Sequence, residues 1–578
     1  MAIAMGWQKP DNVAGSSAPA IMVGLFVATG GLLFGYDTGT INGILEMESF
    51  RRQFATANEL DADGVPKILA SQSSIIVAIL SAGTFLGALL SSPVADWLGR
   101  RLSLIASVGV FSIGAIFQVC ASSIPVLLVG RFLAGVGVGA VSVIVPLYQS
   151  EMAPKWIRGT LVCTYQLSIT LGLLAAAIIN ILTNKIKSSA AYRIPLGIQL
   201  TWAAALALGL LMMPETPRFL IKKGKADAAA LSLSRLRRLD ITHPALIEEL
   251  AEIEANHAWE LSLGPDTYRD IVSGSPHLGR RTLTGCVLQM LQQLTGVNFI
   301  MYYGTTFFAR AGVSNAYLIS VITNLVNAVS TIPALWVIEA WGRRKLLIVG
   351  SIGMSAAQLL IASFTTVAGD TKTDTSNQIL VIFVCIYLFF FAASWGPTVW
   401  VVTSEIYPLK VRAKAMSVST SSNWLLNFGI AYGTPYMVGD EDGAADMGSK
   451  IFFLWGSFCI ISIFFVWFMV FETSRISLEQ IDEMYERIDY AWNSSRFEPS
   501  WSFQQLQHQG WTDSGIPTVD MDSLEPTNSQ TTATTTLNST PSHAEQGVTN
   551  TTTNSTSNSQ SSSDAKILAQ MGNVDFSY

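Results

Sequence analysis

The feature that most constrains this chain is a series of twelve long apolar stretches. Each approaches the roughly 20 consecutive apolar residues that a helix needs to cross the hydrocarbon of a bilayer. Half of the 578 residues are hydrophobic and only 13% are charged, which is too apolar for a water-soluble chain of this length. We therefore predict transmembrane helices near 20–42, 70–91, 102–121, 124–149, 159–182, 194–213, 281–309, 316–338, 346–367, 378–402, 414–437 and 450–471.

Three short patterns occur twice, once in each half of the chain. They are SSPVADWLGRR from Ser91 and PALWVIEAWGRRK from Pro333, Glu-x-x-Pro-x-x-x-Arg from Glu151 and from Glu405, and PETPR from Pro214 with FETSR from Phe471. Duplicated halves that pack around a central site are how many secondary transporters are built. The repetition predicts an all-α membrane protein with two pseudo-symmetric six-helix halves, 20–213 and 281–472.

The remaining segments lie outside the predicted spans. Segment 214–280 is polar and contains helical patterns near 226–239 and 244–257, so we expect a helical linker domain. Residues 473–578 form a tail that is rich in Ser, Thr, Asn and Gln after about 497. Such a composition buries too little apolar surface to offset chain entropy, which predicts disorder there.

The positions of Lys and Arg predict the orientation. Most of the 35 basic residues fall in the N-terminal segment 1–19, the linker, the tail and the alternate connections on the same side. Short connections rich in Lys and Arg face the cytoplasm. Both termini and the linker are therefore expected in the cytoplasm.

Two ionisable residues are expected deep inside the predicted spans, Asp37 in the first and Arg131 in the fourth. Charges in hydrocarbon are costly and usually functional. All five histidines lie outside the spans, so Asp37 is the main candidate for carrying a proton and Arg131 for regulating its charge. The alternative is a permanent ion pair that only joins two helices.

Amide side chains are spread over four predicted spans. They are Gln166, Gln292, Gln293, Asn298, Asn327 and Asn423. An amide offers donors and acceptors, which an uncharged polyhydroxylated ligand requires. Aromatic faces for a sugar ring are available from Trp400, Trp424, Phe34 and Tyr302. The alternative is that each amide only joins neighbouring helices.

Charged residues recur at the cytoplasmic edges of the predicted spans. We interpret them as a latch between helices: Asp96, Arg100, Arg101, Glu151, Arg158, Glu339, Arg343, Arg344, Glu405 and Arg412. Anchoring by positive charge alone explains the arginines but leaves the recurring acids unexplained.

No motif favours an enzyme, a metal or a cofactor. The five cysteines fall within predicted spans and show no CxxC or metal spacing. No phosphate-binding loop or nucleophile triad is evident. We expect no cofactor, no metal and no nucleic-acid partner.

Several longer motifs together resemble the sugar porter family of the major facilitator superfamily, including its fungal hexose transporters and glucose sensors. They are GYDTG, GRR twice, GRFLAGVGVG, PLYQSEMAPKWIRG, PETPRFL, QQLTGVNFIMYY and WGPTVWVVTSEIYP. The resemblance covers roughly 20 to 490 and implies the major facilitator fold.

The resemblance also implies a function. The sugar-contacting positions of the family fall on the six amides, and its ring-stacking tryptophan falls on Trp400. An aspartate in the GYD position, here Asp37, is typical of proton symporters. We therefore expect a plasma-membrane importer of hexose, with glucose as the leading substrate, coupled to protons by alternating access. The alternatives are a facilitative hexose uniporter and a glucose sensor, and the tail is a candidate contact for trafficking or signalling proteins.

Overall fold

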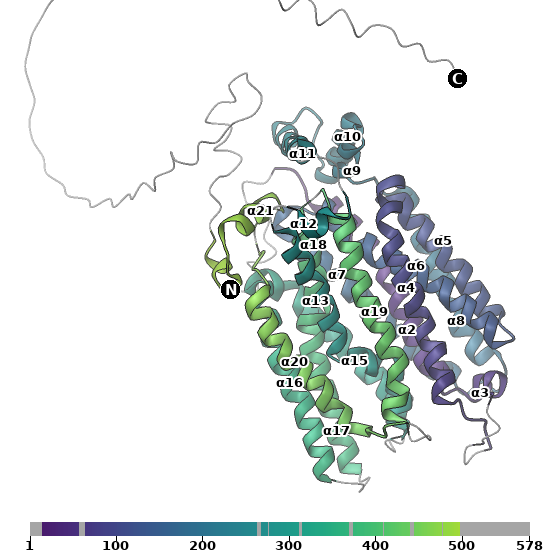
Figure 1. Cartoon of the computed structure of the whole chain (residues 1–578). Coiled ribbons are helices and arrows are strands. Elements are labelled where there is room, and N and C mark those ends of the chain that lie inside the picture. The colour runs from purple at the N-terminus through teal and green to yellow at the C-terminus, as the bar shows by residue number, and fades with distance from the viewer. Residues whose placement is uncertain are drawn as a thin grey trace, which may run out of the picture. The chain divides into compact units, whose positions relative to one another are not determined.

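The computed structural model describes residues 14–56, 60, 64–262, 267–274, 277–310, 315–368, 374–408, 410–439, 444–474, 476 and 478–497. These residues form helices joined by short connections, and no strand occurs among them (Figure 1). The predicted all-α class is confirmed. The tail expected to be disordered after about 497 lies outside the described residues.

The first half, purple to blue in Figure 1, contains helices α1 to α8. Their bounds are α1 Ala18–Ala28, α2 Gly30–Ile44, α3 Glu48–Phe54, α4 Ala70–Leu98, α5 Arg100–Cys120, α6 Ile124–Met152, α7 Arg158–Thr183 and α8 Ala190–Met212. Helices α1 and α2 together form one apolar span, because Thr29 between them keeps right-handed helical dihedrals.

The segment between the halves contains helices α9 to α12. Their bounds are α9 Pro217–Lys222, α10 Ala226–Arg237, α11 Pro244–Ser262 and α12 Asp270–Ser273. The helical patterns expected near 226–239 and 244–257 correspond to α10 and α11. The hydroxyl of Thr216 accepts a hydrogen bond from the Phe219 amide, which caps the start of α9.

The second half and the segment that follows it contain helices α13 to α21. Their bounds are α13 Leu278–Leu294, α14 Val297–Arg310, α15 Ala316–Trp341, α16 Arg343–Ala368, α17 Asp374–Phe390, α18 Gly396–Glu405, α19 Arg412–Val438, α20 Ile451–Met469 and α21 Leu478–Arg487. A π-helical turn, Phe391–Trp395, joins α17 to α18. Such turns often occur at functional sites.

Ten of the helices in the described residues are long and apolar enough to span a membrane. The other two predicted spans, 281–309 and 414–437, are helical but more polar or interrupted. The first divides into α13 and α14 at Gly296, whose φ of 84° favours glycine. The second, α19, carries Ser, Thr and Asn along much of its length. These two spans hold most of the amides singled out above.

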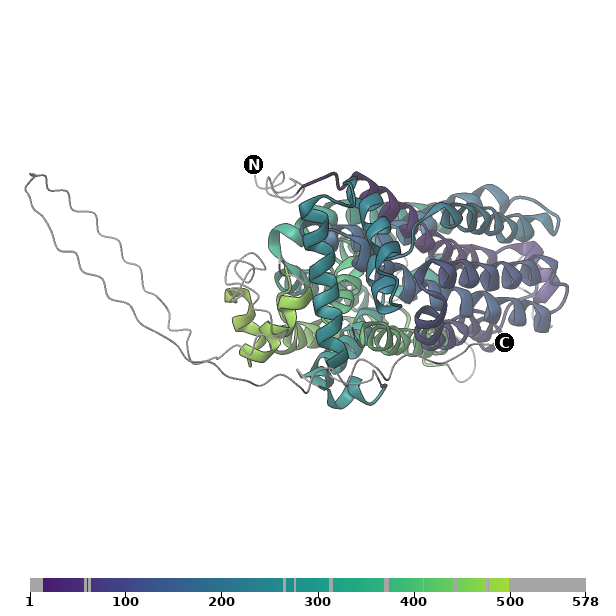
Figure 2. The same ribbon diagram turned by 90° about the horizontal axis from the view of Figure 1, so that it is seen from above.

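The two halves pack against each other through a few helix pairs. Within the first half, α6 packs against α4 and α5, and α2 packs against α7. The halves meet where α4 contacts α19, α7 contacts α15 and α2 contacts α14. Viewed from above, most purple and blue helices gather on one side and most green and yellow helices on the other (Figure 2).

Small residues allow the helices of the first half to approach closely. A Cβ at Gly87 of α4 would lie 2.0 Å from the carbonyl oxygen of Val136, and one at Gly135 of α6 would lie 2.2 Å from that of Leu80. Backbone contact of this kind is typical of helix pairs in membranes. This close backbone contact holds α6, and therefore Arg131 on α6, against α4.

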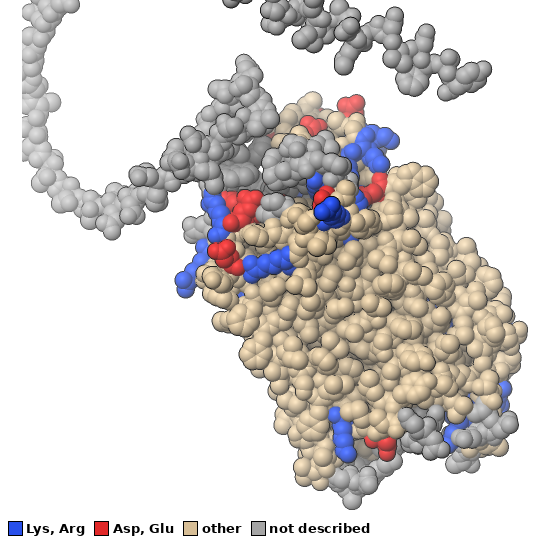
Figure 3. All heavy atoms as spheres, viewed as in Figure 1, with Lys and Arg blue, Asp and Glu red and all other residues tan. Residues whose placement is uncertain are grey.

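Charged side chains are absent from the middle of the outer face that Figure 3 shows. On the face seen in Figure 3, a wide band over the long helices lacks Lys, Arg, Asp and Glu, which collect at the two ends. Most of them lie at the end that carries α9 to α12 and α21. An apolar band between polar ends matches a bilayer.

Candidate functional site

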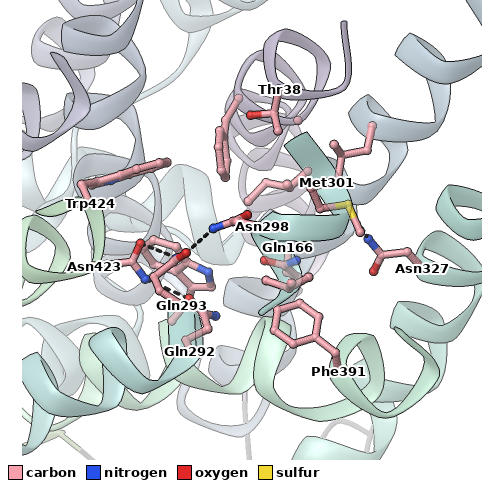
Figure 4. Close-up of a pocket in the computed structure, with 16 residues that line it drawn as sticks. Thr38, Gln166, Gln292, Gln293, Asn298, Met301, Asn327, Phe391, Asn423 and Trp424 are labelled. Carbon is pink, nitrogen blue, oxygen red and sulfur yellow. Dashed lines mark hydrogen bonds between the residues drawn. The ribbon is translucent and has the colours of Figure 1, made fainter. Parts of the chain in front are cut away.

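A cavity between the two halves collects the polar residues singled out in the sequence (Figure 4). All seven residues expected to contact a sugar line it: Gln166, Gln292, Gln293, Asn298, Asn327, Trp400 and Asn423. The space inside is about 50 Å³. A water molecule requires about 10–15 Å³ by this measure, so the cavity in this conformation has room for a few waters.

The amides of the second half bind one another in a network. Asn423 on α19 donates to Gln289 Oε1 at 2.7 Å and to Gln292 Oε1 at 3.0 Å. Its own oxygen accepts from Gln293 Nε2 at 2.7 Å. Asn298 on α14 also donates to Gln293 Oε1. Because each amide orients the next, the cavity presents a fixed pattern of donors and acceptors.

Two further amides complete the lining from other helices. Gln166 comes from α7 of the first half. It lies beside Gly396 of α18, because a Cβ added at Gly396 would be 3.3 Å from Gln166 Nε2. Asn327 on α15 donates to the sulfur of Met301 at 3.9 Å. Residues of both halves therefore contribute polar groups to one cavity.

Aromatic rings form part of the cavity wall. Trp400 on α18 packs edge-on against Tyr165, with ring centroids 5.6 Å apart. Trp424 on α19 packs edge-on against Phe34 at 5.0 Å, and both line the cavity. Tyr302, also expected in the apolar wall, lies outside the lining and is fully buried.

The structure also identifies residues that sequence reasoning missed. Thr38, Met301 and Phe391 line the cavity. Gln289 and Asn427 lie behind it and bind the lining amides. A signal was available for the last two, because Gln289 precedes Gln292 by three residues and Asn427 follows Asn423 by four. That spacing places each pair on one helix face.

Asp37 and Arg131 form a buried pair beside the cavity. Asp37 Oδ2 lies 3.8 Å from Arg131 Nη1, and the side chains are 1% and 0% exposed. Arg131 Nε donates instead to the carbonyl oxygen of Ile76 on α4 at 2.6 Å. Within the described residues, neither carboxylate oxygen of Asp37 has a hydrogen-bond partner. The next residue, Thr38, lines the cavity, so the pair adjoins the amide site.

The first set of latch residues surrounds Arg100 at the start of α5. Its guanidinium lies 2.9 Å from Glu151 at the end of α6 and 3.6 Å from Asp96 at the end of α4. Thr216 donates to the second oxygen of Glu151 at 2.6 Å. Arg158, from the same motif as Glu151, lies beside it in a cleft under α9 to α11. The acids and bases of different motifs therefore meet in one cluster.

The second set repeats this arrangement around Arg343. Its guanidinium lies 2.8 Å from both Glu339 and Glu405, and Thr473 donates to Glu405 at 2.7 Å. The first half approaches closely here. A Cβ at Gly159 of α7 would lie 2.4 Å from Glu339 Oε1. The two halves are thus in contact at this end of the bundle.

Three other expected latch arginines bind backbone carbonyl oxygens. Arg101 donates to Met213 at 3.1 Å, Arg344 to Trp467 at 2.8 Å and Arg412 to Tyr407 at 3.0 Å. These contacts tie the helix ends to neighbouring segments.

The opposite end of the bundle is also joined across the halves. The carboxylate of Glu46 accepts from the Thr306 hydroxyl at 2.7 Å, and Asn42 accepts from the Thr305 amide at 3.1 Å. Tyr317 donates to the carbonyl oxygen of Gly43 at 3.1 Å. The two halves are therefore in contact at both ends of the bundle.

Residues 23–485 match the family model described as sugar (and other) transporters. The chain belongs to the sugar transporter family. It is 68% identical over 527 residues to the probable glucose transporter rco-3 of Neurospora crassa, covering 90% of this chain and 89% of that protein. It is 40% identical over 486 residues to the high glucose sensor RGT2 of Saccharomyces cerevisiae, covering 83% of this chain and 62% of that protein.

Solved structures of sugar transporters share this fold. The proton:xylose symporter XylE, bound to 6-bromo-6-deoxy-D-glucose, superposes with a TM-score of 0.70 at 26% identity, over 81% of this chain and all of that chain. The expected major facilitator fold is thereby confirmed. Members of this family are transporters and not enzymes, as the sequence predicted.

Proposed function

We propose that this sugar transporter imports hexose together with protons by alternating access, with glucose as its substrate. The observation that carries the proposal is one cavity between two helical halves, lined by six amides and by Trp400. Such a lining offers donors and acceptors to hydroxyls and an apolar face to the ring of a sugar. The name of the Neurospora crassa relative, a probable glucose transporter, supports the choice of glucose.

Proton coupling is assigned to Asp37 with Arg131. Burial disfavours a charged carboxylate, whereas a nearby guanidinium favours it, so the proton occupancy of Asp37 responds to which end of the bundle is open. One positive charge moving inward gains about 2.3 kcal/mol per 100 mV, enough for about fiftyfold accumulation. The description of XylE as a proton:xylose symporter supports this part of the proposal.

The proposed orientation places the end with α9 to α12 in the cytoplasm. The gathering of basic side chains at that end supports it (Figure 3). In this arrangement the halves are 20–213 and 281–472, 214–280 is the cytoplasmic linker domain, both termini are cytoplasmic and the membrane is the plasma membrane. The clusters around Arg100 and Arg343 then act as the cytoplasmic latch.

A transport cycle requires the cavity to enlarge. At about 50 Å³ it holds a few waters but not a hexose of twelve heavy atoms. Breaking the Glu46–Thr306 contact opens one end, and breaking the clusters around Arg100 and Arg343 opens the other. Alternating between these two openings moves the cavity from one side of the bilayer to the other.

The test is uptake into proteoliposomes that contain the purified full chain. Radiolabelled glucose and external pH are recorded together, with and without an imposed inward proton gradient. We expect glucose to accumulate above its external concentration, alkalinisation of the medium on sugar addition, and loss of accumulation with a protonophore. Uptake that only equilibrates, with no proton movement, would instead identify a facilitative uniporter.

A glucose sensor is the second candidate. Identity to the sensor RGT2 is 40%, compared with 35% to the hexose transporter HXT10 of the same yeast. Expression in yeast that lacks hexose carriers separates the two functions. A transporter restores growth and labelled uptake, whereas a sensor restores neither and alters gene expression through its tail.

A further inference from the structure

The chain turns back toward the bundle after its last long helix, α20. A short helical turn, Ala491–Arg496, packs against α20 and is called the C-terminal turn below. Ser494 in this turn is buried, and its hydroxyl accepts a hydrogen bond from the backbone amide of Glu472 at 2.8 Å. Ala491 is fully buried as well. These contacts hold the C-terminal turn at a fixed place beside the end of α20.

Helix α21, which leads to this turn, is attached to the start of α13. The guanidinium of Arg281 pairs with Asp482 and lies 4.1 Å from the centre of the Tyr485 ring. The neighbouring Arg280 donates to the carbonyl oxygen of Asp489 at 2.7 Å. The segment from α21 to the C-terminal turn therefore rests on two helices of the second half, α13 and α20.

Three aromatic side chains form a chain of ring contacts where α20 meets the C-terminal turn. Trp492 packs edge-on against Phe468 of α20, with ring centroids 5.9 Å apart. Tyr490 stacks on Trp492 at 4.7 Å. Phe468, Tyr490 and Trp492 are 52%, 55% and 38% exposed. We call these three exposed rings the aromatic platform.

Packing within the protein does not account for this exposure. A second aromatic pair in the same segment, Phe471 and Tyr485, stacks with ring centroids 4.4 Å apart and is only 0% and 2% exposed. That pair has the burial expected of rings that only hold α21 in place. The aromatic platform instead presents large apolar surfaces outward, which is informative where such residues are contiguous.

The aromatic platform continues the outer surface of a membrane-spanning helix. Helix α20 belongs to the apolar stretch Gly448–Met469, and Phe468 is its penultimate residue. Phe464, one turn earlier on the same face, is also exposed. Trp and Tyr are enriched at the two membrane–water interfaces, where their rings lie at the level of the lipid headgroups. Tyr490 and Trp492 thus lie where the lipid-facing surface of α20 reaches the headgroup layer.

The charges next to the aromatic platform are balanced. The charged residues within 486–496 are all exposed, and they are two acids and two bases: Glu486, Arg487, Asp489 and Arg496. A basic cluster would favour anionic lipids, whereas this mixture favours neither sign. The attraction to a membrane surface must then come from the rings themselves.

We propose that the aromatic platform is an interfacial anchor that inserts into the headgroup layer of the bilayer beside α20. Its partner is the phospholipid interface itself, without a requirement for anionic lipids. The anchor holds the segment after α20 against the membrane surface and so keeps α21 on the start of α13, the helix that brings Gln292 and Gln293 to the cavity. This role does not depend on proton coupling or on the identity of the sugar.

The experiment measures the surroundings of position 492 in the full chain. A fluorescent naphthyl amino acid replaces Trp492 by stop-codon suppression, which leaves the native cysteines in place, and the protein is reconstituted into phosphatidylcholine nanodiscs. Quenching by a nitroxide lipid labelled near the headgroup is compared with quenching by aqueous iodide. The matched control carries the same amino acid at Glu486, an exposed charged position on the adjacent α21. Tyr490 is a second probe position, for use if the variant at 492 does not fold.

We expect the ratio of lipid quenching to iodide quenching to be several-fold higher at 492 and 490 than at 486. The ratio should stay the same when anionic lipid is added and when the salt concentration is raised. Equal ratios at the three positions would overturn the anchor. So would protection of 492 from both quenchers, which would mean that protein covers the platform. Lipid quenching that requires anionic lipid and disappears in high salt would also overturn it, in favour of a contact driven by charge.

Discussion

The carboxylate of Glu215 caps the helix that begins at Arg100, which lies 115 residues earlier in the chain. Its two oxygens accept from the backbone amides of Arg100 and Arg101, each at 3.1 Å. In the second half, Glu472 accepts from the amides of Arg343 and Arg344 at 2.9 and 3.1 Å. The repeated PETPR and FETSR patterns therefore place a negative group at the positive end of a helix in each half.

Replacing the capping carboxylate should destabilise the protein. Glu215→Ala leaves two amide groups at the start of α5 without their acceptor, which costs about 1–2 kcal/mol. Thermal unfolding of the purified protein in detergent should show a lower Tm. Glu254→Ala, on the exposed face of α11, is the control and should leave Tm unchanged. Equal Tm values for both variants would contradict the capping role.

The same carboxylate predicts a pH dependence of stability. Burial raises the pKa of Glu215 above its usual value despite its backbone hydrogen bonds. When a carboxyl has a higher pKa in the folded protein than in the unfolded chain, the folded protein loses stability as the pH rises from the unfolded pKa through the folded pKa. Glutamine does not titrate, so the Tm of Glu215→Gln minus the Tm of wild type should increase from pH 4.5 to pH 7.5. A difference in Tm that is constant, or that worsens with pH, would contradict this sign.

Gln293→Ala should weaken sugar binding. The amide of Gln293 both donates to Asn423 and accepts from Asn427, and it lines the cavity. Its removal takes one ligand contact and disorders the neighbouring amides, which should raise the Kd for glucose about tenfold. Gln149→Ala removes a buried amide that does not line the cavity and serves as control. Unchanged competition by glucose in Gln293→Ala would show that the amides only join helices.

Asp37→Asn should separate accumulation from exchange. Asparagine keeps the shape of the side chain but carries no proton, so the accumulation ratio should fall to about one while sugar exchange persists. Sealed vesicles with an inward proton gradient provide the measurement. Asp227→Asn, on the exposed surface of α10, should accumulate like wild type. Accumulation that survives in Asp37→Asn would remove the proposed proton site.

Gly159→Ala should open the end that contains the clusters around Arg100 and Arg343. The added methyl lies 2.4 Å from Glu339 and 2.5 Å from Arg343, so these side chains must move. A change of about 1 kcal/mol alters the open population about fivefold. Cys163, buried on the same helix, should then react faster with a permeant maleimide. Gly109→Ala, with no atom within 4 Å of the added Cβ, should leave the labelling rate unchanged.

The candidate site was largely predictable because its residues sit in recognisable motifs. The seven expected sugar contacts line one cavity, and Asp37 lies beside Arg131. Tyr302, expected in the apolar wall, is absent from the cavity lining and donates to Asn427 behind it. Which way a buried aromatic side chain points depends on the neighbouring helices, and no local pattern reports it.

The sequence by itself determined the apolar helices, their duplication and the residue types available to a site. These properties are local, because the length and hydropathy of a stretch decide whether it can span a bilayer. Only the tertiary structure decided the partners: Glu151 with Arg100, Glu215 with the start of α5, and Asn427 between Gln293 and Ser81. The partners in most of these contacts lie more than 100 residues apart, so helix packing alone brings them together.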